Sequence, residues 1–225
     1  DHVSGRFHWA PKAKMRIADV GSKNFYYAPA IHAFFQPTRL VGIELDGFHL
    51  YRGFYTTPNY QTGDKPYSTT GGAILFGEAG EPIRQKVETI PFELTVPRTV
   101  PPPGGFPIVL YAHGTGGDYA SFEDDGTARE LASVGCAVMG IDQVLHGERN
   151  PTTGTPDFLF FNFQNPLAER DNNRQAALDV VQQARFVANM SVPVAIAADG
   201  GAPIRFDASR IYIFGHSQGG LNLPI

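Results

Sequence analysis

RIYIFGHSQGG, the stretch at residues 210–220, joins an apolar run to a serine that is set among glycines. The run RIYIF has the length and apolar character of a strand that is buried on both faces of a parallel sheet. The glycines that follow it end the strand and predict a tight turn. We therefore expect Ser217 to lie just beyond the end of a strand, at the edge of a sheet.

The spacing Gly215-x-Ser217-x-Gly219 between a strand and a helix predicts the sharp turn known as a nucleophile elbow. In this turn the serine backbone is strained and the hydroxyl projects above the sheet edge. The residues two before and two after the serine crowd each other, and glycine has no side chain to clash there. Gly220 would let the next helix approach the sheet. The alternative is that this stretch is a glycine-rich loop with an inert serine. The position of the motif directly after an apolar strand argues against this alternative.

Two earlier apolar runs predict further buried strands, PIVLYA at residues 107–112 and CAVMGID at residues 136–142. Helical segments lie between the runs. Strands that alternate with helices predict an α/β fold, with a mostly parallel sheet, helices on both faces and right-handed crossovers. Ligands of such sheets lie beyond the carboxyl ends of the strands. His113, the segment 142–146 and Ser217 each follow a predicted strand, so we expect the functional site at this edge.

The clearest helix is predicted at residues 166–190, with Asn165 as its cap and Pro166 in its first turn. One face of this helix carries small and apolar side chains: Ala177, Val181, Ala184 and Ala188, broadened by Val180 and Val187. Another helix is predicted at residues 121–135. A long loop, or a loop with short elements, is expected at residues 143–165.

A second motif, HGTGG, directly follows the strand at 107–112. A serine that attacks a carbonyl needs backbone N–H groups to stabilise the oxyanion that forms, and these come from the residue after the nucleophile and from the loop after an earlier strand. Gln218 is the residue after the serine, and Thr115 is our choice in the loop. Gly114 and Gly116 remain alternatives for the second donor.

The two motifs, in this order and about a hundred residues apart, resemble the α/β-hydrolase family of serine esterases and lipases. The patterns PIVLYAHGTGG, IDQVLHGERNP and FNFQNPLAERDNNRQ are similar to a group of bacterial extracellular lipases and esterases. The resemblance covers residues 107–225. It implies the α/β-hydrolase fold and cleavage of carboxylic esters through an acyl-enzyme on Ser217. It implies no metal or organic cofactor.

The N-terminal part of the chain is predicted to be partly β. Residues 39–56 favour strands, and residues 73–97 predict two strands joined by the turn GEAGEP, a hairpin similar to the antiparallel strands that open the family's sheet. We expect an N-terminal extension at residues 1–70 and the front half of the catalytic domain at residues 71–225.

The family's other two triad residues, an Asp or Glu and then a His, follow the serine in sequence. After Ser217 this chain holds neither. We expect a second polypeptide segment to supply them and to complete the domain. Two alternatives are open: the polypeptide ends here and is inactive or accessory, or an upstream histidine is the base.

His146 is the best upstream candidate for a base, although the resemblance gives this position a pocket-lining role. His113 is expected to support the oxyanion loop, and His216 to point into or across the sheet, because the neighbours of the serine diverge from it. Four other histidines have no spacing typical of a metal site: His2, His8, His32 and His49. Phe160 and Phe161 either line an apolar acyl pocket or anchor their loop to the core.

Composition limits the remaining choices. The 225 residues include 18 basic and 22 acidic side chains, a net charge of −4, which argues against a nucleic-acid partner and leaves a small-molecule or lipid ester as the expected substrate. No apolar run is long enough to cross a membrane. A single cysteine, Cys136, fits an extracellular or periplasmic enzyme and also a cytoplasmic one. A non-catalytic relative of the fold, and a peptidase or thioesterase, remain alternatives.

Overall fold

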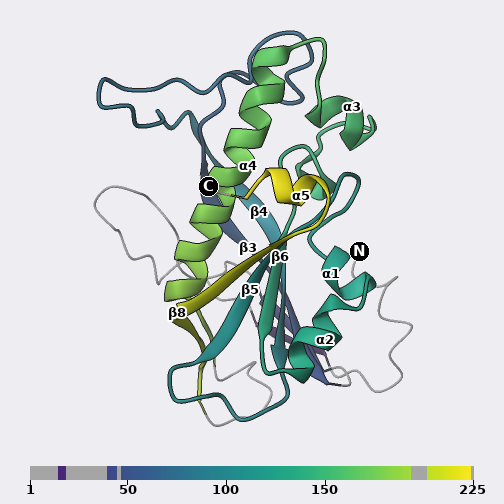
Figure 1. The fold of residues 1–225 in the computed structure, drawn as a ribbon, viewed down its shortest axis with the longest axis vertical. Helices are drawn as coiled ribbons and strands as arrows, with labels where there is room; N and C mark the ends of the chain where they lie inside the picture. The colour runs from purple at the N-terminus through teal and green to yellow at the C-terminus, as the bar shows by residue number, and fades with distance from the viewer. Residues whose placement is uncertain (1–14, 19–39, 45–46, 194–201, 224–225) are drawn as a thin grey trace.

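The computed structural model describes residues 15–18, 40–44, 47–193 and 202–223. The described strands form an eight-stranded sheet in the order β1-β2-β3-β4-β6-β5-β8-β7 (Figure 1). The strands are β1 Met15–Ala18, β2 Leu40–Glu44, β3 Phe48–Asn59, β4 Lys86–Pro97, β5 Phe106–Ala112, β6 Ala137–Ile141, β7 Ser191–Val192 and β8 Ile204–Gly215. The helices are α1 Ser121–Asp124, α2 Thr127–Ser133, η2 Gly147–Arg149, α3 Pro156–Phe160, α4 Pro166–Asn189 and α5 Gln218–Leu221.

The three strands predicted around the site are confirmed and lie side by side. β5 pairs in parallel with β6 on one edge and with β8 on the other. β8 begins six residues earlier than the predicted run, at Ile204, and Phe206 pairs with Phe106 across a shift in register. Because β5 and β8 are parallel neighbours, the segments that follow them emerge at the same edge of the sheet.

Helices cover both faces of the parallel strands, as predicted. On β5, Ile108 and Leu110 belong to the core that also contains Phe186 of α4. Val109 and Tyr111 alternate with them and join the core that contains Phe122, Ala128 and Ala132 of the two short helices. Figure 1 shows α4 on one side of the sheet and α1 and α2 on the other.

The predicted hairpin at residues 73–97 is wrong in its first strand. β4 pairs along its whole length with β3, whereas the segment before it contributes only two isolated bridges, Gln61 with Ile74 and Phe76 with Pro82. Glycines and a proline interrupt residues 77–82, so this segment cannot extend a ladder. The boundary predicted at residue 70 falls in the connection between β3 and β4, and strands from both sides of it pair in one sheet.

The predicted helix at residues 121–135 is broken into α1 and α2. Gly126 has φ of 88°, a left-handed conformation that an α-helix cannot contain, and it stands at the N-cap of α2. Asp125 helps to fix the break, because its carboxylate accepts a hydrogen bond from the Thr127 amide at 2.9 Å. The chain therefore turns between two short helices instead of continuing one long one.

The predicted α4 is confirmed in extent and capping, because the Asn165 side chain accepts a hydrogen bond from the Ala168 amide. Its buried face matches the predicted one only in part: Val180 and Val187 are buried, and Ala184 packs against the same core. Ala177, Val181, Ala184 and Ala188 are only half-buried. The buried face includes polar side chains: Asp171, Asn172, Gln175, Asp179, Gln182 and Gln183. Within the described part of the chain, all of these polar residues except Gln182 have hydrogen-bonding or ion-pair partners in other segments, which a count of apolar residues does not register.

Candidate active site

Ser217 occupies a strained turn directly after β8. Its φ of 52° and ψ of −119° lie in a region that non-glycine residues rarely adopt, and the residue is exposed. The predicted crowding around it is confirmed. A Cβ on Gly215 would lie 2.7 Å from the backbone of Gly219, and a Cβ on Gly219 would lie 1.9 Å from the carbonyl oxygen of Ala112. The two glycines therefore let α5 fold back against β5 beneath the serine.

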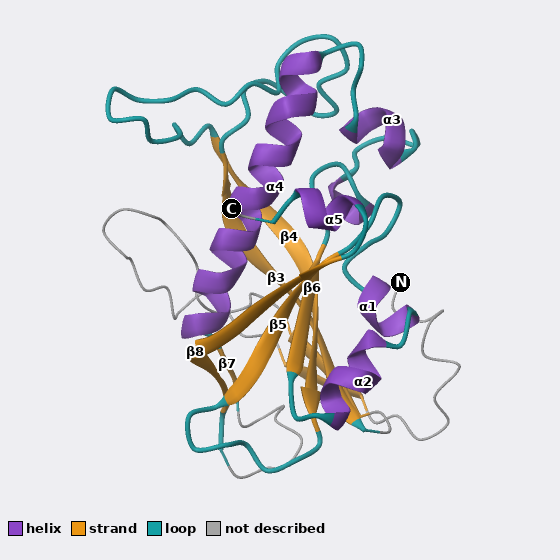
Figure 2. Cartoon of the chain, in the orientation of Figure 1, coloured by secondary structure: helices purple, strands orange, loops and turns teal. Residues whose placement is uncertain are grey.

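The loop after β5 passes directly beside the serine. A Cβ on Gly114 would lie 3.1 Å from the Cβ of Ser217, so only glycine fits comfortably there. The loop turns through Gly116, whose φ is 80°, and the Gly117 amide donates to the Gly114 carbonyl at 3.0 Å. Figure 2 shows α5 following β8 at the end of the sheet where this loop emerges from β5.

The two predicted oxyanion donors come from residues that contact each other. The Thr115 hydroxyl donates to the Gln218 side-chain oxygen at 2.7 Å. Within the described part of the chain, the backbone amides of Thr115 and Gln218 donate to no acceptor. The amides of Gly114 and Gly116 are also unpaired among these residues. Unpaired N–H groups beside an exposed serine are what stabilisation of an oxyanion requires.

His113 lies at the base of this loop with both ring nitrogens engaged. Its Nε2 accepts a hydrogen bond from the Gln143 amide at 3.0 Å, so the proton is on Nδ1, which donates to the Gly114 carbonyl at 2.8 Å. Burial lowers the pKa of His113 to about 4, which keeps the ring neutral. These bonds fit the predicted support of the loop and leave no nitrogen free to accept a proton from Ser217.

The other two histidines of interest differ in burial. His146 is fully buried, its Nδ1 contacts the Val144 carbonyl oxygen at 2.9 Å, and burial lowers its pKa. No hydrogen bond joins it to Ser217 in the described structure. His216 is exposed rather than packed into the sheet, and its Nδ1 would lie 3.1 Å from a Cβ on Gly114. It therefore lies against the backbone of the loop after β5.

The phenylalanine-rich segment is anchored by one ring. Phe160 is completely buried and packs edge-on against His146 and Phe161, with ring centroids 5.7 and 5.2 Å away. Phe161 is half-buried, whereas Phe158 is 75% exposed. Phe160 thus contacts the buried His146 in the protein interior and does not reach the surface.

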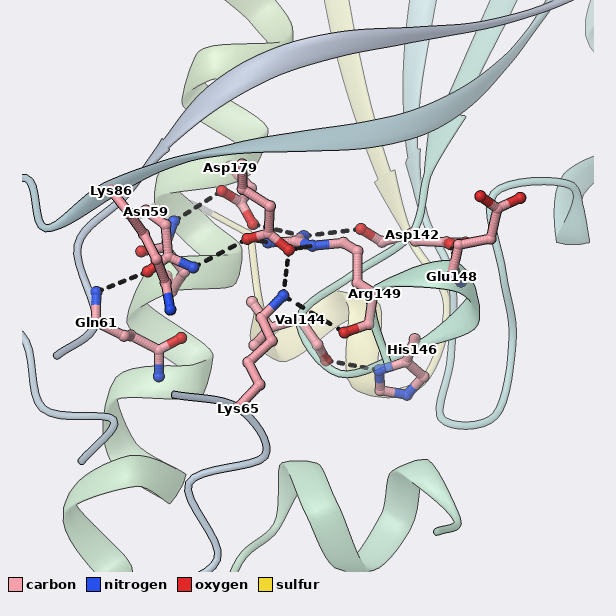
Figure 3. A network of polar contacts seen from close by, with 12 residues as sticks. Asn59, Gln61, Lys65, Lys86, Asp142, Val144, His146, Glu148, Arg149 and Asp179 are labelled. Carbon is pink, nitrogen blue, oxygen red and sulfur yellow. Dashed lines mark hydrogen bonds and ion pairs between the residues drawn. The ribbon is translucent and has the colours of Figure 1, made fainter. Parts of the chain in front are cut away.

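A cluster of charged residues that sequence analysis did not predict fixes the segment after β6. Arg149 is buried, and its Nη1 donates to the Asp142 carbonyl at 2.8 Å and forms an ion pair with Asp179 at 2.7 Å (Figure 3). Its Nε lies 3.1 Å from Glu88, which also pairs with Lys65. Burial alone would raise the pKa of Glu88, but the two cations outweigh burial and hold this pKa well below its usual value.

Two uncharged residues to which sequence analysis assigned no role of their own, Gln143 and Asn222, connect the site internally. The Gln143 side chain donates to the His113 carbonyl, and its oxygen accepts a hydrogen bond from the Asn222 side chain at the end of α5. Gln143 and Asn222 are 79 residues apart in sequence. No local pattern marks such a pair, although both lie within segments that flank the predicted motifs.

Comparison with known proteins gives structural likenesses only. No protein-family model and no curated protein matches the chain. Among solved structures, an acetyl xylan esterase from a Paenibacillus species is 19% identical, with a TM-score of 0.42 over 93% of this chain and 47% of that one. Acetyl xylan esterase 1 from a Thermoanaerobacterium species is 15% identical, with a TM-score of 0.42 over 94% and 47%. A dienelactone hydrolase from Anabaena variabilis is 18% identical, with a TM-score of 0.34 over 72% and 54%.

The chain thus spans about half the length of these structures. The fold itself is decided by the parallel neighbours β5 and β8 and by the strained serine turn that follows β8. In the described part of the chain, the strand order and the strained serine turn after β8 are those of the α/β-hydrolase fold. Among the described helices, none is both long and apolar enough to span a bilayer.

Proposed function

We propose that this chain carries the nucleophile and the oxyanion hole of a serine hydrolase that cleaves carboxylic esters. The observation that carries the proposal is the strained backbone of the exposed Ser217, beside the unpaired amides of Thr115 and Gln218. Such strain costs about 1–3 kcal/mol and persists mainly where function requires it. A binding module has no need of a strained, exposed serine, which argues against a non-catalytic relative of the fold.

The reaction follows from the geometry of the site. The Ser217 hydroxyl oxygen attacks the ester carbonyl while a base takes the hydroxyl proton. The carbonyl oxygen becomes negative, and the Thr115 and Gln218 amides donate hydrogen bonds to it. The bond to the alcohol then breaks and the alcohol leaves with the proton, so an acyl-serine remains. Water repeats the sequence, releases the acid and restores the hydroxyl.

The base in this proposal is a histidine from a second polypeptide segment, oriented by a carboxylate from the same segment. Three observations support an external source. Both nitrogens of His113 are engaged, and His146 is buried away from the serine. In addition, β8 carries exposed apolar side chains on both faces, with Tyr212 at 51%, Ile213 at 41% and Phe214 at 48%.

Such exposure is unusual for a strand in the parallel part of a sheet. The neighbouring β5 is buried at every equivalent position from Ile108 to Tyr111. A further strand beside β8, with helices over it, would bury the exposed side chains. A photoreactive residue in place of Ile213 should therefore cross-link to a segment that contains an acidic residue and a histidine. Cross-links confined to the described elements would contradict the external segment.

The proposed substrate is a small-molecule or lipid ester, in an extracellular or periplasmic setting. The net charge of −4 gives no support for a nucleic-acid partner. A peptidase or thioesterase would use the same serine and the same donors. Comparing an ester, a thioester and an amide with the same acyl group distinguishes the three activities. The proposal predicts the highest kcat/KM for the ester.

The test of the nucleophile is covalent labelling with a fluorophosphonate probe. The protein should be labelled at Ser217, and Ser217→Ala should abolish the labelling. Ser133→Ala is the matched control, because Ser133 is an exposed serine on α2 whose hydroxyl donates to the Glu130 carbonyl at 2.7 Å. Labelling that persists in Ser217→Ala, or that is absent from the folded parent protein, would refute the proposal.

A further inference from the structure

Side chains join the loop after β5 and the turn after β8 at two separate points. At the first, the Thr115 hydroxyl donates to Gln218 at 2.7 Å. At the second, Gln143 donates to the His113 carbonyl and accepts from Asn222. The two points lie at opposite ends of α5, because Gln218 begins this helix and Asn222 caps it.

Three polar groups of Gln143 take part in this connection: the backbone N–H, the side-chain N–H and the side-chain oxygen. Its amide N–H donates to the His113 ring at 3.0 Å, so the loop residue is held through both its ring and its carbonyl. The side-chain oxygen is the acceptor for Asn222. Gln143 and Asn222 are buried, so water does not compete for these bonds.

The segment that carries Gln143 is itself fixed from the other side. Arg149 donates to the carbonyl of Asp142, the residue before Gln143, and the Asp142 carboxylate accepts from the Tyr119 amide at 2.8 Å and the Glu148 amide at 2.6 Å. Gln143 is therefore held in place independently of α5 and of the loop after β5, and it links the two rigidly.

The remaining polar groups of α5 are consistent with a closed arrangement. The Gln218 Nε2 and the Asn222 Oδ1 are buried and have no partner in the described structure. They are a donor and an acceptor four residues apart, a separation that places side chains on the same face of a helix. The other polar atom of each side chain takes part in the two connections, Gln218 through its Oε1 and Asn222 through its Nδ2.

We propose that Gln143 and Asn222 are positioning residues that hold the oxyanion loop and the serine turn at the separation that the two backbone donors require. This inference rests on the proposed function, because it assigns these residues a role in the same site. Neither residue touches the substrate. Their role is to prevent the Thr115 amide from moving relative to the Gln218 amide when negative charge develops between them.

The test compares Gln143→Leu and Asn222→Ala with Gln183→Leu in the protein as it exists. Gln183 is the matched control, because it is buried and its side chain donates to the Met139 carbonyl at 2.8 Å, with no contact to the site. Each positioning variant should label with fluorophosphonate about 10- to 100-fold more slowly than Gln183→Leu, since small displacements at a reacting centre have effects of this size. With an ester, kcat should fall while KM stays unchanged, because the donors act mainly in the transition state.

A readout independent of activity separates this inference from the proposed function. The amides of Gly117 and Gly219 donate hydrogen bonds at 3.0 and 2.8 Å within the two joined segments. Their hydrogen exchange should be faster in both positioning variants than in Gln183→Leu. If one of the two variants does not fold, the other still serves as the test, because each removes one partner of the hydrogen bond between Asn222 and Gln143.

The outcomes are distinguishable. Slower labelling together with faster exchange supports the positioning role. Labelling and exchange equal to those of Gln183→Leu overturn it, while labelling at Ser217 leaves the proposed function standing. Absence of labelling in the parent protein overturns the proposed function, and the exchange comparison then decides whether Gln143 orders the loop.

Discussion

Replacing Gly219 with alanine tests the geometry of the serine turn at its most crowded point. A Cβ at this position would lie 1.9 Å from the Ala112 carbonyl oxygen, 2.6 Å from its carbonyl carbon and 2.9 Å from the His113 oxygen. All three atoms belong to the backbone of β5 and the loop after it, so no flexible side chain can move aside. The turn or the strand end must shift instead.

The size of the shift follows from these contacts. Because carbon and oxygen atoms in weak contact stay about 3.3 Å apart, the helix must move away from Ala112 by roughly 1.4 Å. Displacement by about 1 Å at a reacting centre can lower a rate about 100-fold. Overpacking of this kind also destabilises a protein by about 1–3 kcal/mol. We therefore expect Gly219→Ala to fold with reduced stability and to label at Ser217 about 100-fold more slowly.

The neighbouring glycine provides the control. A Cβ on Gly220 would have the Gly215 carbonyl oxygen as its nearest contact, at 3.9 Å, which is ordinary van der Waals distance. Gly220→Ala should therefore label at the parent rate and gain about 0.5–1 kcal/mol of stability in the helix. Equal fluorophosphonate labelling rates for Gly219→Ala and Gly220→Ala would refute the reasoning.

Three further predictions follow from the surroundings of the site. Arg149→Met leaves the buried carboxylate of Asp179 without the cation that pairs with it. This change should reduce the free energy of unfolding in urea by about 3–5 kcal/mol, and a loss below about 1 kcal/mol would contradict the prediction. Because the pKa of His113 is about 4, below the value of about 6.5 expected in the unfolded chain, stability should fall as the pH drops from 6.5 to 4. In His113→Gln, the free energy of unfolding should depend less on pH over this range. An unchanged pH dependence would contradict the conclusion that the His113 ring is neutral. Phe160→Ala should destabilise the protein by about 3–5 kcal/mol, because this ring is buried, whereas Phe158→Ala should have little effect, because its ring is exposed. Similar shifts in melting temperature for the two variants would contradict the anchoring role of Phe160.

The parts of this molecule that sequence could predict depend on local patterns. The strand before Ser217 and the glycines around it form one short stretch, and its requirements are steric and local. The loop at His113 follows from the same kind of pattern. The two segments meet because a parallel sheet places the carboxyl ends of neighbouring strands at the same edge.

The features that sequence missed depend on buried polar pairs between distant segments. The face of α4 was predicted from apolar spacing, but Gln175, Asp179 and Gln183 are buried because partners in other elements satisfy them. Arg149 and Glu88 are 61 residues apart, and Gln143 and Asn222 are 79 apart. An apolar pattern records which residues avoid water, whereas these residues are buried because of their partners.

The predicted hairpin failed for a related reason. The segment before β4 contains strand-forming residues, but strand pairing is a competition between all available partners. β3 pairs with twelve residues of β4, while the interrupted segment at residues 73–85 cannot match that length. The partner of β4 is β3, which comes earlier in the chain than the segment at residues 73–85. The local turn pattern GEAGEP was therefore insufficient to predict the pairing.

The most direct test of this account is a crystal structure of the protein after reaction with a fluorophosphonate. The phosphorus should be bonded to the Ser217 oxygen, and the phosphoryl oxygen should lie about 2.7–3.1 Å from the backbone nitrogens of both Thr115 and Gln218. A phosphoryl oxygen that faces solvent, or a probe attached to a different residue, would contradict the assignment of this turn and loop as a catalytic site.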